Sequence, residues 1–141
     1  MAKKSALYRI YEDLVNALKG VIETKYIFTD RPDISDASPM KKFAVIDLPV
    51  GISDYVIGHR KTMLTTSGVL YLFTAETKVG SLDVNLAGDF VDSVVDLFPI
   101  SGKTIVAVKP TVLMRGSDKQ GFQVTTISFD LRSKWGVLVN K

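Results

Sequence analysis

The sequence lacks cysteine and contains a single histidine, His59. Without cysteine, the chain cannot use a thiol nucleophile, a cysteine-ligated zinc, an iron–sulfur cluster or a disulfide framework. A lone histidine also excludes chemistry built on paired imidazoles, and no serine or acid stands in a recognisable catalytic relation to His59. We therefore interpret His59 as a surface residue and expect no catalytic residue, no metal ligand and no cofactor.

Long apolar runs are also missing. No window approaches the roughly 18 uninterrupted apolar residues of a membrane-spanning helix. The basic start of the chain, residues 1–5, leads into an amphipathic pattern rather than into the apolar core of a signal peptide. We expect a short mobile tail over residues 1–5, synthesis in a cytoplasm and no membrane partner.

Neither sign of charge dominates the sequence. It contains 18 Lys and Arg residues and 15 Asp and Glu residues, which gives a formal net charge of +3. The basic residues are scattered, which favours a solvated surface over a dedicated DNA- or RNA-binding patch. With 141 residues, 46% of them hydrophobic, the chain can bury one core without a covalent or metal staple. We predict a single domain over residues 1–141.

Apolar residues at helical spacing predict two amphipathic helices. The first begins after a Ser5 N-cap, with Glu12 and Asp13 on its solvent side and Gly20 near its end. The second covers 82–98, with Ser81 as its N-cap. The apolar face of the first helix is Leu7, Ile10, Tyr11, Leu14, Leu18 and Val21, and that of the second is Leu82, Leu86, Phe90, Val94 and Leu97.

Alternating and continuous apolar runs predict the strands, with polar segments between them. The run 43–48 indicates burial on both faces, and Lys109-Pro110 indicates an edge position or a bulge within the strand 104–114. The two prolines and the Asx residues of 29–42 indicate a long surface loop. The other strands are 26–28, 60–75 and 122–134; the other loops are 49–59 and 115–121.

The element order α-β-β-α-β-β predicts an α+β fold, a twisted and mostly antiparallel sheet with both helices on one face. Two β-hairpins are long for such a small domain, because a strand of twelve residues spans about 40 Å against the usual 17–20 Å. We expect these hairpins to project beyond the core. Another copy of the chain is the simplest source of support for them.

Three motifs suggest phosphate or metal chemistry. Ser101-Gly102-Lys103-Thr104 lacks the first glycine and the strand–helix order of a phosphate-binding loop, so we interpret it as a turn. Asp30, Asp33 and Asp36 lack the alternate spacing and the glycine of a calcium loop and are typical of turns.

The third motif, Pro32-Asp33 with Glu76-Thr77-Lys78, resembles the Pro-Asp … (Asp/Glu)-x-Lys signature of a large nuclease superfamily. A carboxylate and a lysine at i and i+2 on a strand would face one metal-bound phosphate. Against this interpretation, the triplet recurs at Glu23-Thr24-Lys25 and Pro32-Asp33 lies in an expected loop. A Mg²⁺-dependent nuclease remains the alternative function.

The layout of the chain from Leu7 to Trp135 resembles the tail terminator (tail-completion) and neck, or head–tail connector, proteins of tailed bacteriophages. The resemblance rests on the amphipathic first helix, on Phe28-Thr29-Asp30-Arg31-Pro32 leading to Phe43-Ala44-Val45, and on the two long hairpins around a short second helix. The net positive charge and the apolar run Val137-Leu138-Val139 depart from the usual pattern.

The resemblance implies a structural virion protein without catalytic residues, which forms a ring around the DNA channel in the phage neck or tail. It implies a homo-oligomer, with a hexamer favoured over a dodecamer, in contact with neck, portal or tail-tube proteins and with non-specific double-stranded DNA in the lumen. Synthesis would take place in the host cytoplasm. We select Arg60, Lys61, Arg115 and Lys119 as charged contacts at subunit or channel-facing surfaces, with simple solubilisation of the hairpin tips as the equal alternative.

Overall fold

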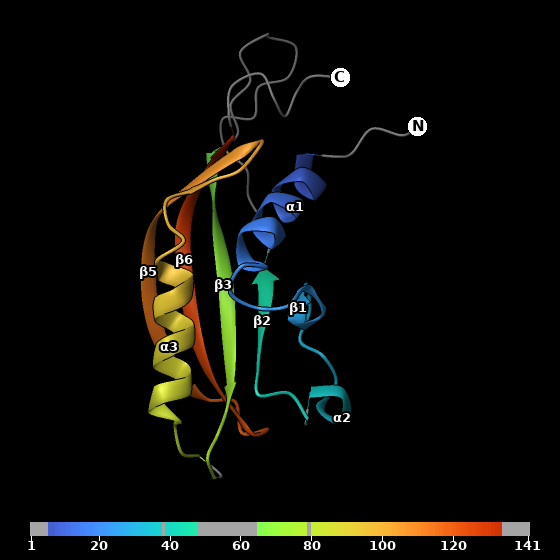
Figure 1. Ribbon diagram of the computed structural model, residues 1–141, viewed down its shortest axis with the longest axis vertical. Helices are drawn as coiled ribbons and strands as arrows, with labels where there is room; N and C mark the ends of the chain where they lie inside the picture. The colour runs from blue at the N-terminus through green and yellow to red at the C-terminus, as the bar shows by residue number, and fades with distance from the viewer. Residues whose placement is uncertain (1–5, 38, 48–64, 79, 134–141) are drawn as a thin grey trace, which may run out of the picture.

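The computed structural model describes residues 6–37, 39–47, 65–78 and 80–133 (Figure 1). The elements in chain order are α1 (Ala6–Leu18), the 3₁₀ helix η1 (Thr24–Tyr26), β1 (Ile27–Phe28), α2 (Ile34–Ala37), β2 (Lys42–Asp47), β3 (Thr65–Ala75), α3 (Val84–Val95), β4 (Ile100–Ser101), β5 (Ile105–Ser117) and β6 (Phe122–Ser133).

The strands form one six-stranded sheet in the order β1-β2-β3-β6-β5-β4. All neighbouring pairs are antiparallel except β1 and β2, which run parallel. The long strands β3 and β6 pair without interruption from Thr65 opposite Arg132 to Ala75 opposite Phe122. The predicted α+β class and mostly antiparallel sheet are therefore confirmed.

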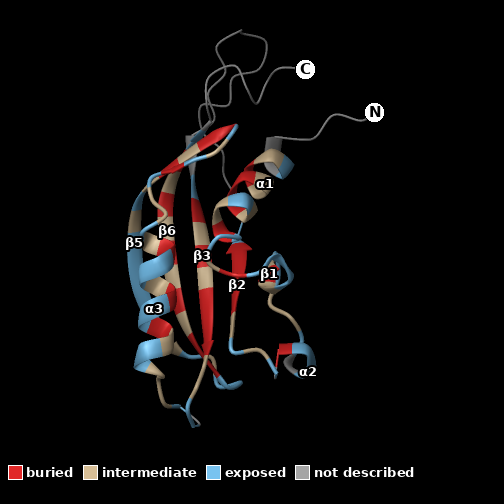
Figure 2. Ribbon diagram, viewed as in Figure 1, coloured by how far each residue is buried: buried red, intermediate tan, exposed pale blue. Residues whose placement is uncertain are grey.

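Both long helices pack on one face of this sheet (Figures 1 and 2). The predicted apolar stripes supply the contacts, because each stripe turns toward the sheet. Removing these large side chains from water is the main force that joins the helices to the sheet, at roughly 1.5–3 kcal/mol each. The buried contacts are Ile10, Leu14 and Leu18 of α1 and Phe90 and Val94 of α3, against Leu70, Leu72, Ile127, Phe129 and Leu131 of β3 and β6.

A second, smaller core lies on the opposite face of the sheet. The rings of Phe43 and Phe73 stack with centroids 4.5 Å apart, and Phe122 meets Phe43 edge-on at 5.1 Å. Ala37 of α2 is buried against this cluster. The expectation of a plain surface loop over 29–42 was therefore wrong in part, because a short helix within it places a small side chain against the aromatic rings.

Two details of the predicted helices were also wrong. The N-cap of α3 is Asp83, whose carboxylate accepts a hydrogen bond from the Leu86 amide at 3.1 Å, so the helix begins after Ser81 and Leu82 rather than at them. Asp13 does not lie on the solvent side of α1 but is buried, because its carboxylate accepts hydrogen bonds from Thr104. Residues 1–5 with the proposed Ser5 cap, residues 48–64 with His59, and residues 134–141 lie outside the described residues.

The predicted irregularity at Lys109-Pro110 is present. The register of β5 against β6 shifts between Val108 and Thr111, and Lys109 has a φ of 59°. Proline has no amide hydrogen to donate to a sheet, and a bulge allows the strand to pass this position. Before the bulge, β5 alternates buried and half-buried residues, whereas most of its residues after the bulge are exposed. None of the helices in the described part of the chain is long and apolar enough to cross a membrane.

Candidate functional site

Among the described residues, nothing pairs with the outer edge of β5 over most of its length. The neighbouring strand β4 pairs only with Val106 and Ala107, and no other described strand lies beyond it in the sheet. From Val108 to Ser117, β5 is therefore bonded on one side alone, to β6. An unpaired strand edge is a template for pairing with another chain.

Three consecutive apolar side chains on this edge face solvent. Val112, Leu113 and Met114 are 41%, 54% and 51% exposed. They lie opposite Ile127, Thr126 and Thr125 of β6, so they alternate between the helix-covered face and the open face of the sheet. Figure 2 shows the corresponding exposed stretch of β5 at the margin of the molecule. Apolar side chains on both faces of an unpaired edge indicate an association surface.

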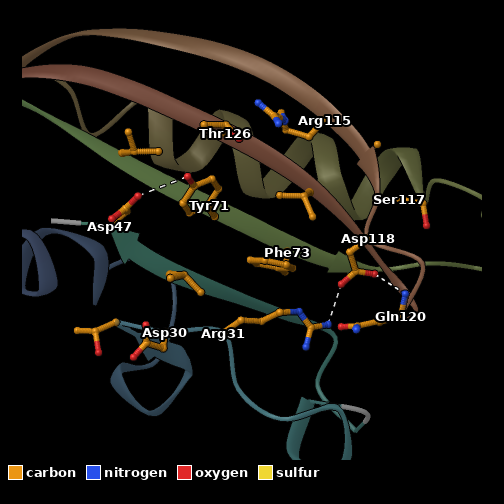
Figure 3. Close-up of a pocket in the computed structure, with 15 residues that line it drawn as sticks. Asp30, Arg31, Asp47, Tyr71, Phe73, Arg115, Ser117, Asp118, Gln120 and Thr126 are labelled. Carbon is orange, nitrogen blue, oxygen red and sulfur yellow. Dashed lines mark hydrogen bonds and ion pairs between the residues drawn. The ribbon is translucent and has the colours of Figure 1, made fainter. Parts of the chain in front are cut away.

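A groove of about 790 Å³ lies on the open face of the sheet, beside this edge (Figure 3). Its floor comes from β2, β3 and β6 and includes Tyr71, Phe73 and Thr126. The Tyr71 hydroxyl lies 3.4 Å from a carboxylate oxygen of Asp47. The charged residues of its wall are Asp30, Arg31, Asp47, Arg115 and Asp118.

One ion pair lies at the end of the groove next to the tip of the β5–β6 hairpin. Arg31 Nη2 donates to Asp118 Oδ2 at 2.7 Å, and the two side chains are 25% and 12% exposed. The guanidinium also lies 5.4–5.9 Å from the ring centroids of Phe43, Phe73 and Phe122. The pair joins the segment after β1 to the tip of the β5–β6 hairpin, although the two residues are 87 positions apart in the sequence.

Asp118 also organises the hairpin tip itself. Its second carboxylate oxygen, Oδ1, accepts hydrogen bonds from the amides of Gln120 at 2.7 Å and Phe122 at 3.0 Å. Lys119 and Gly121 have positive φ values of 62° and 99°, which a tight turn requires and which glycine adopts without strain. The Asp118 carboxylate thus holds the tip together with the backbone hydrogen bond from the Asp118 amide to Phe122 O at 2.8 Å and the bond from the Lys119 amide to Ser117 Oγ at 3.0 Å.

The structure brings two of the four selected basic residues to the same end of one hairpin. Arg115 is exposed and lines the groove, and Lys119 is exposed at the tip. Arg60 and Lys61 lie outside the described residues. The sequence interpretation missed Arg31, Asp118 and the exposed run at 112–114. The exposed run could have been found from the sequence. Three consecutive apolar residues after Pro110 break the alternation that is expected of a strand with one buried face.

The nuclease motif does not form a metal site in the described part of the chain. Asp33 is exposed before α2, whereas Glu76 lies at the end of β3, and neither lines the groove. Glu76 instead accepts hydrogen bonds from the Gly80 amide at 3.0 Å and from Gln123 Nε2 at 2.7 Å. The Gly80 hydrogen bond is the largest cause that lowers the pKa of Glu76. Among the described residues, no three His, Cys, Asp or Glu side chains converge to hold a metal.

The Gly102-Lys103-Thr104 motif is a turn between β4 and β5. The amide and the hydroxyl of Thr104 donate to one oxygen of Asp13 at 2.8 and 2.6 Å. A Cβ atom at Gly102 would lie 2.6 Å from Asp13 Cγ, so the close approach of this carboxylate requires glycine. These Thr104 donors are thus bound to a carboxylate of the same chain, and the turn leads into β5 rather than into a helix.

Comparison with known proteins gives a likeness of fold. No protein-family model matches the chain, and no curated protein matches it. The structure is similar to a chain from the solved structure "Virion of native gene transfer agent (GTA) particle", with a TM-score of 0.53 and 10% sequence identity. The likeness covers 92% of this chain and 94% of that chain. At this identity, the two chains share a fold along nearly their whole lengths.

Proposed function

We propose that this protein is a structural component of a phage-like virion. The observation that carries the proposal is the shared fold, which extends over 92% of this chain and 94% of a chain in a gene transfer agent virion. The resemblance to tail terminator and neck proteins, which rests on other features of the chain, points in the same direction.

In this proposal the protein assembles as a homo-oligomeric ring in the neck or tail, around the DNA channel. The free edge of β5 supports association, because its unpaired backbone and its exposed residues Val112, Leu113 and Met114 need a cover. A closed ring removes such edges from solvent. A hexamer is favoured and a dodecamer is the alternative.

The ring would dock on a neighbouring portal, neck or tail-tube protein and present a new surface to the next component. Arg115 and Lys119 are our candidates for charged contacts with a neighbouring subunit or with the DNA that passes through the lumen, as are Arg60 and Lys61. Non-specific phosphate contacts of this kind need basic side chains and no base-reading geometry.

Native mass spectrometry and electron microscopy of the purified protein test this proposal. We expect rings of six or twelve copies, either for the protein alone or after co-expression with candidate portal and tail-tube proteins. A protein that stays monomeric and binds none of these partners would overturn the proposal.

A matched pair of variants tests the role of the free edge. Leu113→Lys places a charge on the edge of β5, and Val84→Lys makes a similar change at a 69% exposed position of α3. Both positions are exposed, so both variants should fold. We expect Leu113→Lys to reduce ring formation strongly and Val84→Lys to leave it unchanged.

A further inference from the structure

The part of β5 that no described strand covers has a regular centre and irregular ends. Its register against β6 shifts between Val108 and Thr111 and again between Met114 and Gly116. Pro110, at the first shift, has no amide hydrogen to offer to a neighbouring strand. Bulges and proline protect a strand edge from pairing. The residues from Thr111 to Met114 are therefore the part of this edge that another strand can join.

This regular part is apolar on both faces of the sheet. Leu113 lies opposite Thr126, which lines the groove on the open face. Val112 lies opposite Ile127, which belongs to the core on the helix-covered face, and Met114 points to that same face. A surface packed against one face of the sheet would leave the apolar side chains of the other face exposed. A strand that continues the sheet covers all three side chains at once.

A second copy of β5 meets this requirement in one register. Residues directly opposite each other in an antiparallel pair lie on the same face of the sheet, so β5 can pair with its own copy about a residue but not about a point between two residues. Pairing about Leu113 places Leu113 opposite itself and Val112 opposite Met114. The three exposed apolar side chains of each copy then cover those of the other.

The other registers of β5 against itself bring like charges together. A shift of the centre by one residue toward the start of β5 sets Lys109 opposite Arg115, and a shift by one residue the other way sets Lys109 opposite Lys119. A parallel pair in register would set Lys109 beside Lys109. These basic side chains are exposed, and like charges directly opposite destabilise a sheet. Pairing about Leu113 sets Lys109 opposite Ser117 instead.

We propose that two copies of this protein join at their β5 edges as an antiparallel pair centred on Leu113, about a two-fold axis perpendicular to the sheet. The two sheets then form one continuous sheet, and this axis keeps α1 and α3 of both copies on the same face. The pair goes beyond the proposed ring and does not depend on it, since a ring of six or twelve copies contains a whole number of pairs.

Charge at the position that faces itself provides the first test. In Leu113→Lys and in Leu113→Glu, two like charges replace an apolar contact at the axis. Each variant alone should therefore raise the dissociation constant of the pair at least about tenfold. In an equimolar mixture, lysine of one copy meets glutamate of the other, and mixed pairs should far exceed the half that random mixing gives. Val84→Lys and Val84→Glu, at an exposed position of α3, are the controls and should pair as the unmodified protein does.

Native mass spectrometry and sedimentation measure these pairs. One variant of each mixture is labelled with ¹⁵N, so that a mixed pair has an intermediate mass. Circular dichroism verifies that each variant is folded. A contact in which Leu113 faces any other residue would gain nothing from the mixture, because lysine and glutamate at this position would never meet.

The absence of cysteine from the sequence allows a second, independent test. Leu113→Cys places one thiol on each side of the axis, with Cα atoms about 4.5–5.5 Å apart, within the range of a disulfide. Val112→Cys and Met114→Cys each place their own two Cα atoms roughly 8 Å apart, beyond that range. Under mild oxidation, we expect a covalent dimer from Leu113→Cys, none from Val112→Cys or Met114→Cys alone, and one from their mixture.

The outcomes distinguish this inference from the proposed function. A protein that forms pairs but no ring, alone or with its partners, would support the inference and count against the ring. Rings in which Leu113→Cys forms no disulfide would overturn the inference and leave the ring standing. Leu113→Lys and Leu113→Glu that pair as tightly as the unmodified protein, or a mixture that pairs no better than either variant, would overturn the inference, as would an unmodified protein that never pairs.

Discussion

Removal of the Arg31–Asp118 pair should destabilise the protein and release the tip of the β5–β6 hairpin. A hydrogen bond to a charged group contributes about 1.5–3 kcal/mol when it is partly buried, and this one is 2.7 Å long between side chains that are 25% and 12% exposed. The position of the guanidinium over the rings of Phe43, Phe73 and Phe122 adds about 0.5–2 kcal/mol. We expect Arg31→Ala to lower the free energy of unfolding by about 3 kcal/mol.

Milder substitutions at Arg31 and Asp118 separate the contributions of charge and of hydrogen bonds to the free energy of unfolding. Asp118→Asn keeps an oxygen that can accept from the amides of Gln120 and Phe122 but loses the charge, and it should cost about 1.5 kcal/mol. Asp118→Ala loses all three hydrogen bonds and should cost about 3 kcal/mol. Arg31→Lys keeps the charge but not the planar fork, and should lie between the unmodified protein and Arg31→Ala.

Equilibrium unfolding in urea at pH 7, analysed as a double-mutant cycle, is the assay. The cycle over Arg31→Ala and Asp118→Ala should give a coupling energy of about 1.5 kcal/mol. A coupling energy below about 0.3 kcal/mol, the level of a solvent-exposed pair, would refute the reasoning. Hydrogen exchange should also show faster exchange of the Gln120 and Phe122 amides in Asp118→Ala, while the amides of α1 stay protected.

Three further predictions concern contacts outside the groove. Asp13→Ala leaves the buried Thr104 amide and hydroxyl without their acceptor and should lower the free energy of unfolding by about 2–4 kcal/mol in urea titrations, against almost no change for an exposed aspartate of α3. Gly102→Ala should cost a similar amount, because its Cβ would lie 2.6 Å from Asp13 Cγ, and unchanged thermal unfolding would contradict the packing described. The pKa of Glu76 is lowered from 4.5, chiefly by the Gly80 amide, so its carboxylate stabilises the fold above that value and this contribution disappears as the pH falls through the lower pKa of the folded state. The stability difference between the unmodified protein and Glu76→Gln should therefore be present at pH 6 and shrink below pH 4, and a difference independent of pH would contradict the assignment.

Local patterns predicted most of the elements and their faces. The helical spacing of Ile10, Leu14 and Leu18 indicated the face of α1 that packs on the sheet, and that face is buried. The strand alternation likewise separated Leu70 and Leu72 from Tyr71 and Phe73, which lie on opposite faces of β3. Such patterns succeed because burial depends on which side of an element a residue occupies, and the helical and strand periods determine that side.

The candidate site was less predictable. Arg115 and Lys119 were selected as contacts from their place in a polar hairpin tip, and the structure puts both near the groove and the free edge of β5; their role as contacts stays a prediction. The free edge itself depends on where β4 ends, since two more paired residues would have covered part of it. The length of β4 is set by the turn that follows Ser101, and the apolar pattern of the sequence does not locate that turn.

The sequence by itself determined the two helices, the long strands, the irregularity at Lys109-Pro110 and the α+β class, because each of these follows from residues that are neighbours along the chain. Only the tertiary structure decided that Asp13 is buried against Thr104 and that Arg31 reaches Asp118, 91 and 87 positions away. Charged side chains look alike in a sequence whether they are solvated or paired, since their partners come from segments that only the folded sheet brings together.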